Sequence, residues 1–419
     1  MNPTLSEPPQ WGAPDGGYAL RRLGFSTLVA TICNVGMWSV IVVLPAVQAE
    51  FGVNRSDASL PYSLTMVGLA VGAVMLGRLA DRFGFAPPLA LAGLIQGVGY
   101  LIAAAAPNLT VFALAHLLLI GPGAGIAFGP LMADISHWFV KWRGRAVVIV
   151  ASGNYLAGVV WPLAINAGLP SLGWRGVHVA IAVVVLISSA PLALAMRRRP
   201  SEASLSRAEA ASTAARADVG VSPRALVSML VLAGFSCCVA MSMPQVHLVA
   251  YCGDLGYGVA AGAQMLSLML GLGIVSRLAS GALADRIGPI ATLALGSFMQ
   301  GLALLLYTQF NGLTSLYVVS GLFGLFHGGI VPMYAIICRE LLSPREAGAN
   351  IGYVVAATTF GMAFGGYASG LIFDLTGSYR AAFLNGVAWN VLNFAIVCWL
   401  WWRRTRASAA GRATAGAAA

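Results

Sequence analysis

Gly77-Arg78-Leu79-Ala80-Asp81-Arg82-Phe83-Gly84 is the stretch that decides the fold, because the chain contains it twice. The second copy is Gly281-Ala282-Leu283-Ala284-Asp285-Arg286-Ile287-Gly288, and the two aspartates are 285 − 81 = 204 residues apart. Two other pairs recur near this offset: Trp174-Arg175 with Tyr379-Arg380, and Arg143-Gly144 with Arg345 through Gly348. A repeat of this length predicts that one multi-helix unit was duplicated, as in transporters built from two parallel halves.

Apolar stretches surround both copies. Of 419 residues, 58% are hydrophobic and 9% charged, whereas soluble domains are about 25% charged. About twenty apolar residues cross a hydrocarbon layer of about 30 Å, and only helices or closed barrels satisfy the backbone there. We therefore expect an all-α integral membrane protein with twelve transmembrane helices. The expected spans are 23–46, 60–80, 87–106, 110–134, 146–169, 176–196, 226–252, 259–283, 289–309, 313–338, 346–371 and 380–402.

The spans divide into two pseudo-symmetric six-helix bundles, 23–196 and 226–402. A leader (1–22), a linker (197–225) rich in Ser, Ala and Glu, and a tail (403–419) complete the chain. The first span lacks a convincing cleavage site and precedes eleven others, so it is not expected to be a removable signal. The six cysteines lack metal-ligand spacing, which predicts packing roles and no metal site.

The positive charge is distributed by side of the membrane. Arg55, Arg175 and Arg380 fall on predicted outer segments and Arg277 falls within a span, which leaves 24 − 4 = 20 Lys and Arg on the other side. The positive-inside rule then places both termini and the linker in the cytoplasm, in a multi-pass protein of the cytoplasmic (inner) membrane. This distribution favours a lipid bilayer over nucleic acid as the partner of the +10 chain.

The repeated stretches resemble the signature loop of the major facilitator superfamily, Gly-x-x-x-Asp-Arg-x-Gly, which implies the twelve-helix fold of that family. In physical terms, Gly77 permits close helix approach, and Asp81 can bind neighbouring arginines and the positive end of a helix. We expect a charge latch that breaks when the halves rock; the alternative is a plain basic loop. The predicted gating residues are Gly77, Asp81, Arg82, Asp134, Arg143, Gly281, Asp285 and Arg286.

Three stretches resemble the monocarboxylate transporter and oxalate/formate antiporter branch. They are the leader Pro14-Asp15-Gly16-Gly17-Tyr18, the loop Trp138-Phe139-Val140-Lys141-Trp142-Arg143-Gly144-Arg145-Ala146, and Arg277 four residues before Gly281. Both families place an arginine here that binds the substrate carboxylate.

The repeat gives an independent reason to single out Arg277. Subtracting 204 from its number gives Ala73, so the duplicated scaffold does not require a charge. Arg277 precedes Asp285 by eight residues, hence lies about 12 Å deeper along a helix. A lone cation at that depth is costly, so we expect it to face a wet cavity and bind an anion. The alternatives are an arginine that reaches the surface or a permanent carboxylate partner.

The chain departs from the resemblance at three places. Trp38 stands where animal monocarboxylate transporters have a lysine, and Gly273 where they have an aspartate. The eleventh span, 346–371, contains no Lys or Arg that could serve as the second cation for oxalate. A monoanion therefore fits better than a dianion.

Other polar residues lie in apolar spans. His327 is the preferred proton carrier because of its depth, and His247 is expected nearer the outer end. Backbone hydrogen bonding within helix contacts is the alternative for both histidines, and interhelical hydrogen bonding for the asparagines. The predicted substrate-binding residues are Arg277, Asn34, Trp38, Asn154, Tyr155, Gln245, His247 and His327.

These features predict a secondary transporter of a small organic monocarboxylate, working by proton symport or anion exchange. We expect no enzyme activity and no cofactor, and a functional monomer. An efflux carrier for hydrophobic compounds is the main alternative. A membrane receptor or a lipid enzyme finds less support, because there is no sizeable soluble domain and no nucleophile-base constellation.

Overall fold

The computed structural model describes residues 15–139, 142–198, 221–342 and 344–417, and these ranges are almost wholly helical. The α-helices are α1 Gly17–Cys33, α2 Val35–Phe51, α3 Arg55–Phe83, α4 Ala86–Ala104, α5 Leu109–Ala115, α6 Gly121–Ala124, α7 Gly129–Trp138, α8 Arg143–Ala195, α10 Pro223–Asp254, α11 Gly258–Ile287, α12 Pro289–Gln309, α13 Leu313–His327, α14 Ile330–Leu341, α15 Pro344–Thr376 and α16 Tyr379–Ala417. A π-helical turn (His116–Ile120) and a 3₁₀ turn (Gly125–Ala127) complete the fourth span.

The structure confirms the expected all-α membrane fold. Within the described residues, eleven stretches are long and apolar enough to cross a membrane. One of them, Gly144–Ala195, has 52 residues and is interrupted at Gly173, whose φ of 64° is non-helical. Because a straight helix of that length would be more than twice the thickness of the hydrocarbon layer, α8 supplies two spans, and the predicted fifth and sixth spans lie on either side of Gly173.

The duplication is visible in the helix bounds. Adding 204 to the bounds of α3 gives 259–287, and α11 is Gly258–Ile287. Adding 204 to the start of α4 gives 290, and α12 begins at Pro289. The fourth and tenth spans are also broken at matching places, since Gly328 and Gly329 between α13 and α14 correspond to Ala124 and Gly125.

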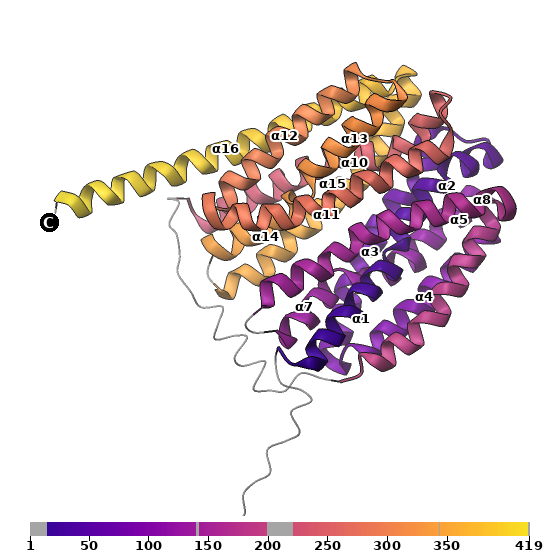
Figure 1. Ribbon diagram of the computed structural model, residues 1–419, viewed down its shortest axis with the longest axis horizontal. Helices are drawn as coiled ribbons and strands as arrows, with labels where there is room; N and C mark the ends of the chain where they lie inside the picture. Colours follow the sequence, from indigo (N-terminus) through magenta and orange to yellow (C-terminus); the bar gives the residue numbers. More distant parts are fainter. Residues whose placement is uncertain (1–14, 140–141, 199–220, 343, 418–419) are drawn as a thin grey trace, which may run out of the picture.

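The two halves lie side by side (Figure 1), with α3 packed on α15 and α8 packed on α11. Small residues make the first contact close. A Cβ on Gly366 of α15 would lie 3.0 Å from the Tyr62 ring of α3, and one on Gly370 would lie 2.9 Å from the Cα of Ser56. Glycine lets the two backbones approach in this way.

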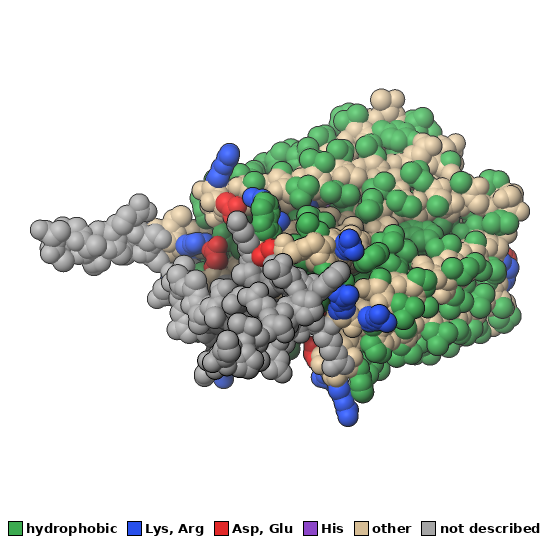
Figure 2. Space-filling view, turned by 60° about the horizontal axis from the view of Figure 1, so that its bottom comes forward, with side chains coloured by type: hydrophobic (Ala, Val, Ile, Leu, Met, Phe, Trp, Pro, Cys, Tyr) green, Lys and Arg blue, Asp and Glu red, His purple; other side chains and the backbone are tan. Residues whose placement is uncertain are grey.

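Hydrophobic and charged side chains occupy different parts of the bundle surface. Figure 2 shows hydrophobic side chains over most of the visible body, whereas the visible charged side chains lie mainly near the end covered by grey atoms. Large apolar residues such as Met75, Ile187 and Leu375 are 59%, 69% and 77% exposed. Such exposure fits a surface in contact with lipid.

Candidate functional site

Arg277 lies between the two halves. Its side chain is 8% exposed, its Nε donates to the Gly328 carbonyl at 3.2 Å, and its Nη1 donates to the Ala151 carbonyl at 2.7 Å. The guanidinium carbon is 4.3 Å from the centroid of the Tyr155 ring. None of the ion pairs among the described residues includes Arg277. The cation is therefore held by carbonyl dipoles and an aromatic face.

Local backbone features create this geometry. The tenth span breaks after His327, which leaves the Gly328 carbonyl available to Arg277. A Cβ on Gly328 would lie 2.1 Å from the Gly273 oxygen, and a Cβ on Gly273 would lie 2.5 Å from Cε1 of Tyr155. Gly273 stands at the position where animal monocarboxylate transporters have an aspartate. The Tyr155 ring packs so closely on Gly273 that it leaves no room for a Cβ.

His327 and Gln245 extend the same cluster. His327 Nδ1 is 2.8 Å from the Phe323 carbonyl, and its Nε2 is 3.0 Å from Nε2 of Gln245. Because a carbonyl accepts only from N–H, the Phe323 contact places a proton on Nδ1. With the Gln245 amide nitrogen assigned to face Nε2, Gln245 donates to this atom. The Tyr155 and His327 rings stack with centroids 5.8 Å apart. Four predicted residues, Arg277, Tyr155, His327 and Gln245, therefore form one continuous group, the Arg277 cluster.

Trp38 and Asn154 border this cluster. Trp38 Nε1 donates to the backbone and side-chain oxygens of Asn154 at 3.1 and 3.2 Å. Asn154 directly precedes Tyr155 on α8. Asn34 lies apart: its Nδ2 donates to the Ala30 carbonyl at 2.7 Å, where α1 meets α2.

His247 belongs to a different group near the predicted outer end. Its Nε2 donates to the Gly366 carbonyl at 2.8 Å, and its Nδ1 is 3.3 Å from the Tyr379 hydroxyl. Arg55 donates from Nη1 to the same hydroxyl at 2.8 Å, and from Nη2 to the carboxylate of Asp254 at 3.0 and 3.1 Å. Arg55 is on α3 and the other residues are in the C-terminal half, so these contacts join the halves.

A second carboxylate strengthens the same junction. Asp374 on α15 accepts from the backbone nitrogens of Arg55 and Ser56 at 2.9 and 2.8 Å, which caps the start of α3 from the opposite half. We call Arg55, His247, Asp254, Asp374 and Tyr379 the outer network. The sequence alone predicts no role for Arg55, Asp254 or Asp374, although Arg55 is one of only three arginines expected outside.

The repeated signature loops are solvent-exposed. Asp81, Arg82, Asp285 and Arg286 are all exposed, and neither aspartate has a hydrogen bond or ion pair with a described side chain. A Cβ on Gly77 would make an ordinary 3.5 Å contact with Pro130, and one on Gly281 would meet nothing within 4 Å. The close helix approach expected at Gly77 is thus absent here. The side chain of Arg143 lies outside the described residues.

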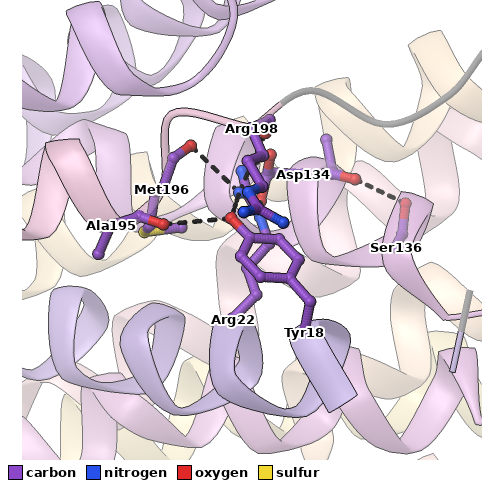
Figure 3. Close-up of polar contacts among 8 residues, drawn as sticks. Tyr18, Arg22, Asp134, Ser136, Ala195, Met196 and Arg198 are labelled. Carbon is purple, nitrogen blue, oxygen red and sulfur yellow. Dashed lines mark hydrogen bonds and ion pairs between the residues drawn. The ribbon is translucent and has the colours of Figure 1, made fainter. Parts of the chain in front are cut away.

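Asp134 pairs with Arg22 inside the N-terminal half (Figure 3). Arg22 donates from Nε and Nη2 to the carboxylate at 2.8 and 2.6 Å, and both side chains are buried. Arg22 Nη1 also donates to the carbonyls of Met196 and Arg198, where α8 ends. All described partners of this pair lie in one half, so Asp134 holds Arg22, which in turn binds the end of α8, and the pair does not bridge the halves in this structure.

Two of the stretches that resemble the monocarboxylate transporter branch meet beside the Arg22–Asp134 pair. The Tyr18 and Trp138 rings meet edge to face with centroids 4.9 Å apart, and the Asp15 nitrogen donates to the Trp138 carbonyl at 3.0 Å. The Arg22 guanidinium lies 4.7 Å from the Trp138 ring. The leader and the loop after the fourth span are therefore parts of one packed unit.

Comparison with known proteins decides the family. The sequence profile of the Major Facilitator Superfamily matches residues 27–315 and 280–418. The chain belongs to this superfamily. It is a multi-pass membrane transporter and not an enzyme, and it resembles the monocarboxylate transporter branch. Monocarboxylate transporter 13 of Bos taurus is 29% identical over 83% of this chain and 86% of its own length.

Two further comparisons define the range of relatives. An agnestins efflux protein of Paecilomyces divaricatus is 23% identical over 78% of this chain and 75% of its own length. The solved structure of a bacterial homologue of the human lysosomal transporter Spinster has a TM-score of 0.71 and 15% identity, and the match covers 95% of this chain and 98% of that one. This second likeness supports the fold alone.

Proposed function

We propose that this carrier transports a small organic monocarboxylate by alternating access, and that Arg277 binds the carboxylate. One observation supports this most: Arg277 is buried between the halves, and the described part of the chain gives it no carboxylate partner. An arginine at the centre of a bilayer costs about 3 kcal/mol or more. Two carbonyls and a ring offset part of that cost, and a bound monoanion would offset the rest.

The neighbours of Arg277 suit a small acid with an apolar body. A guanidinium can hold both oxygens of a carboxylate in a planar fork, while the Tyr155 and Trp38 rings supply apolar surface. Gln245, which now donates to His327, can donate to a substrate oxygen instead. No second arginine or lysine takes part in the hydrogen bonds and ring contacts of this cluster among the described residues, which favours a monoanion over a dianion.

Proton symport and anion exchange both fit this site. Symport needs a group that takes up a proton, and His327 is the candidate for that group. Its Nε2 accepts from Gln245, so a proton could be taken up if the amide turned its oxygen toward the ring. Movement of a monoanion with one proton is electroneutral, whereas exchange needs no titrating group. We expect His327→Ala to weaken the response of uptake to a pH gradient if symport operates.

Alternating access requires gates at both ends. The outer network joins the halves at the predicted outer end, whereas Asp81 and Asp285 at the opposite end are exposed. In the proposed cycle the outer network opens, and the two signature loops form the latch when the opposite end closes. We place this opposite end, with both termini, on the cytoplasmic side of the inner membrane, because arginine is concentrated there.

The experiment is uptake by purified protein in liposomes, with a panel of labelled monocarboxylates and with or without a pH gradient. We expect saturable uptake of at least one labelled acid. Other monocarboxylates should compete with this uptake, and dicarboxylates should not. Transport of hydrophobic compounds that lack a carboxylate, with no uptake of any acid, would instead support the efflux function that one relative's name suggests.

A further inference from the structure

A cavity of about 840 Å³ lies away from the Arg277 cluster, at the end of the bundle where α1 begins and α8 ends. Three arginines line it: Arg21 from α1, and Arg197 and Arg198 from the residues just after α8. No acidic side chain is among its described lining residues. The wall therefore has three positive charges and no described negative one.

These charges have no counterion among the described side chains. Arg21 and Arg197 are exposed and take part in none of the ion pairs there. The Arg198 guanidinium lies 4.9 Å from the Tyr18 ring (Figure 3), an arrangement that fixes its direction without neutralising it. The nearby carboxylate of Asp134 already accepts two hydrogen bonds from buried Arg22, so its charge is paired with Arg22 and not with the arginines of the cavity.

The rest of the cavity is apolar and borders the lipid-facing surface. Phe25 and Leu194 line it beside Tyr18. Leu194 is 65% exposed, and Leu20, next to Arg21 on α1, is 60% exposed. A tyrosine beside basic residues and exposed leucines is the composition found where a transmembrane helix meets the headgroup layer.

We propose that this cavity binds the headgroup of an anionic phospholipid from the leaflet on the side where α1 begins. The three arginines would contact the phosphate, and the acyl chains would lie along Leu20 and Leu194. Basic pockets between transmembrane helices are a known way to recognise such headgroups. A soluble phosphate would satisfy the arginines equally well but would leave the apolar wall unused, so the lipid uses more of the site.

Native mass spectrometry and fluorescent-lipid titration of the purified full-length protein test this. The probe is phosphatidylglycerol, compared with zwitterionic phosphatidylcholine. We expect saturable retention of phosphatidylglycerol by the parent protein. The apparent affinity for this lipid should be about ten-fold lower or more in Arg21→Gln/Arg197→Gln/Arg198→Gln, because each basic residue contributes its own attraction to the anionic headgroup. Arg21→Gln/Arg197→Gln spares the Arg198 stacking on Tyr18, and should show an intermediate loss even if the triple variant folds poorly.

Arg82→Gln/Arg286→Gln/Arg406→Gln is the matched control, because it removes the same charge from described residues outside the cavity. Equal loss in this variant would show that net charge alone attracts the lipid and would overturn the site. Equal retention in the parent and in the double variant would also overturn it. Inorganic phosphate that displaces the lipid at millimolar concentration, with no effect of acyl-chain length, would reassign the cavity to a free anion.

Discussion

Arg277 on α11 donates from Nη1 to the Ala151 carbonyl on α8 at 2.7 Å, so the buried cation of one half is held by the backbone of the other. The same guanidinium binds the Gly328 carbonyl of its own half. A carboxylate that replaced the Ala151 carbonyl would remove this contact between the halves. In this account, substrate binding and the rocking motion are coupled through one side chain.

Gly273→Ala should disturb the candidate site directly. A Cβ there would lie 2.5 Å from the Tyr155 ring, so the ring that packs on Arg277 must shift. We expect at least a ten-fold loss of uptake in liposomes, with normal insertion. Gly271→Ala, two residues away on α11, is the control, because its Cβ would make an ordinary 3.6 Å contact with Val159. Equal uptake by both variants would contradict the role given to the Tyr155 ring.

Arg55→Gln should open the predicted outer end more often. It removes the contacts to Asp254 and Tyr379 that join the halves, and we expect a shift of about 1–3 kcal/mol, the scale of conformational coupling. In a cysteine-free background, Ser63→Cys on α3, which faces the Ala363 carbonyl of α15, should then react faster with an impermeant thiol reagent.

Arg175→Gln is the matched control for this measurement. Arg175 pairs with Glu50 at 2.7 Å at the same end, but the two side chains are 37% and 42% exposed and belong to the N-terminal half. Its removal should leave the labelling rate of Ser63→Cys unchanged. Faster labelling in both variants, or in neither, would remove the gate assignment from the outer network.

Arg22→Gln should destabilise the protein strongly. Loss of one partner of a buried ion pair costs about 3–5 kcal/mol, and Arg22 and Asp134 are 1% and 8% exposed. Arg175→Gln breaks an exposed pair instead, for which about 0–1 kcal/mol is usual. The midpoint of thermal unfolding in detergent measures the difference. Similar midpoints for the two variants would show that the Arg22–Asp134 pair contributes little to stability.

Thiol labelling of intact cells tests the orientation. On a cysteine-free background, Ser204→Cys lies in the linker, outside the described residues, and Asn311→Cys lies in the exposed turn between α12 and α13. An impermeant reagent should label only the second. Labelling of only the first would reverse the predicted topology.

Much of the fold follows from local sequence properties. Each expected span is long and apolar, and the duplicated Asp81 and Asp285 loops align the halves. The structure confirms the all-α membrane fold, with eleven long apolar stretches among the described residues, one of which is divided at Gly173. Arg277, Gln245 and His327 stand out as candidates for a related reason: a polar residue in an apolar span is conspicuous wherever its partner lies. Their grouping with Tyr155 could not be read from sequence, because it depends on the packing of α8, α10, α11 and α13.

The outer network could not be predicted from the sequence, because its acidic residues are not conspicuous. Asp254 and Asp374 lie at helix ends, where acidic residues are common and give no signal. Their partner Arg55 is 199 residues from the first and 319 from the second. The only sequence signal is that Arg55 falls on the predicted outer side, where few arginines are expected. Asp134 was expected at a gate, but its partner Arg22 becomes visible only when α1 packs beside α7.

Equilibrium binding of a transported monocarboxylate to purified protein tests the central claim most directly. Isothermal titration of the parent, Arg277→Lys and Arg277→Ala should give saturable binding, weaker binding and no measurable binding, because an ammonium cannot reproduce the planar fork. Circular dichroism and gel filtration would show that each variant remains folded. Binding of the acid by Arg277→Ala with the affinity of the parent would contradict the proposal that Arg277 binds the carboxylate.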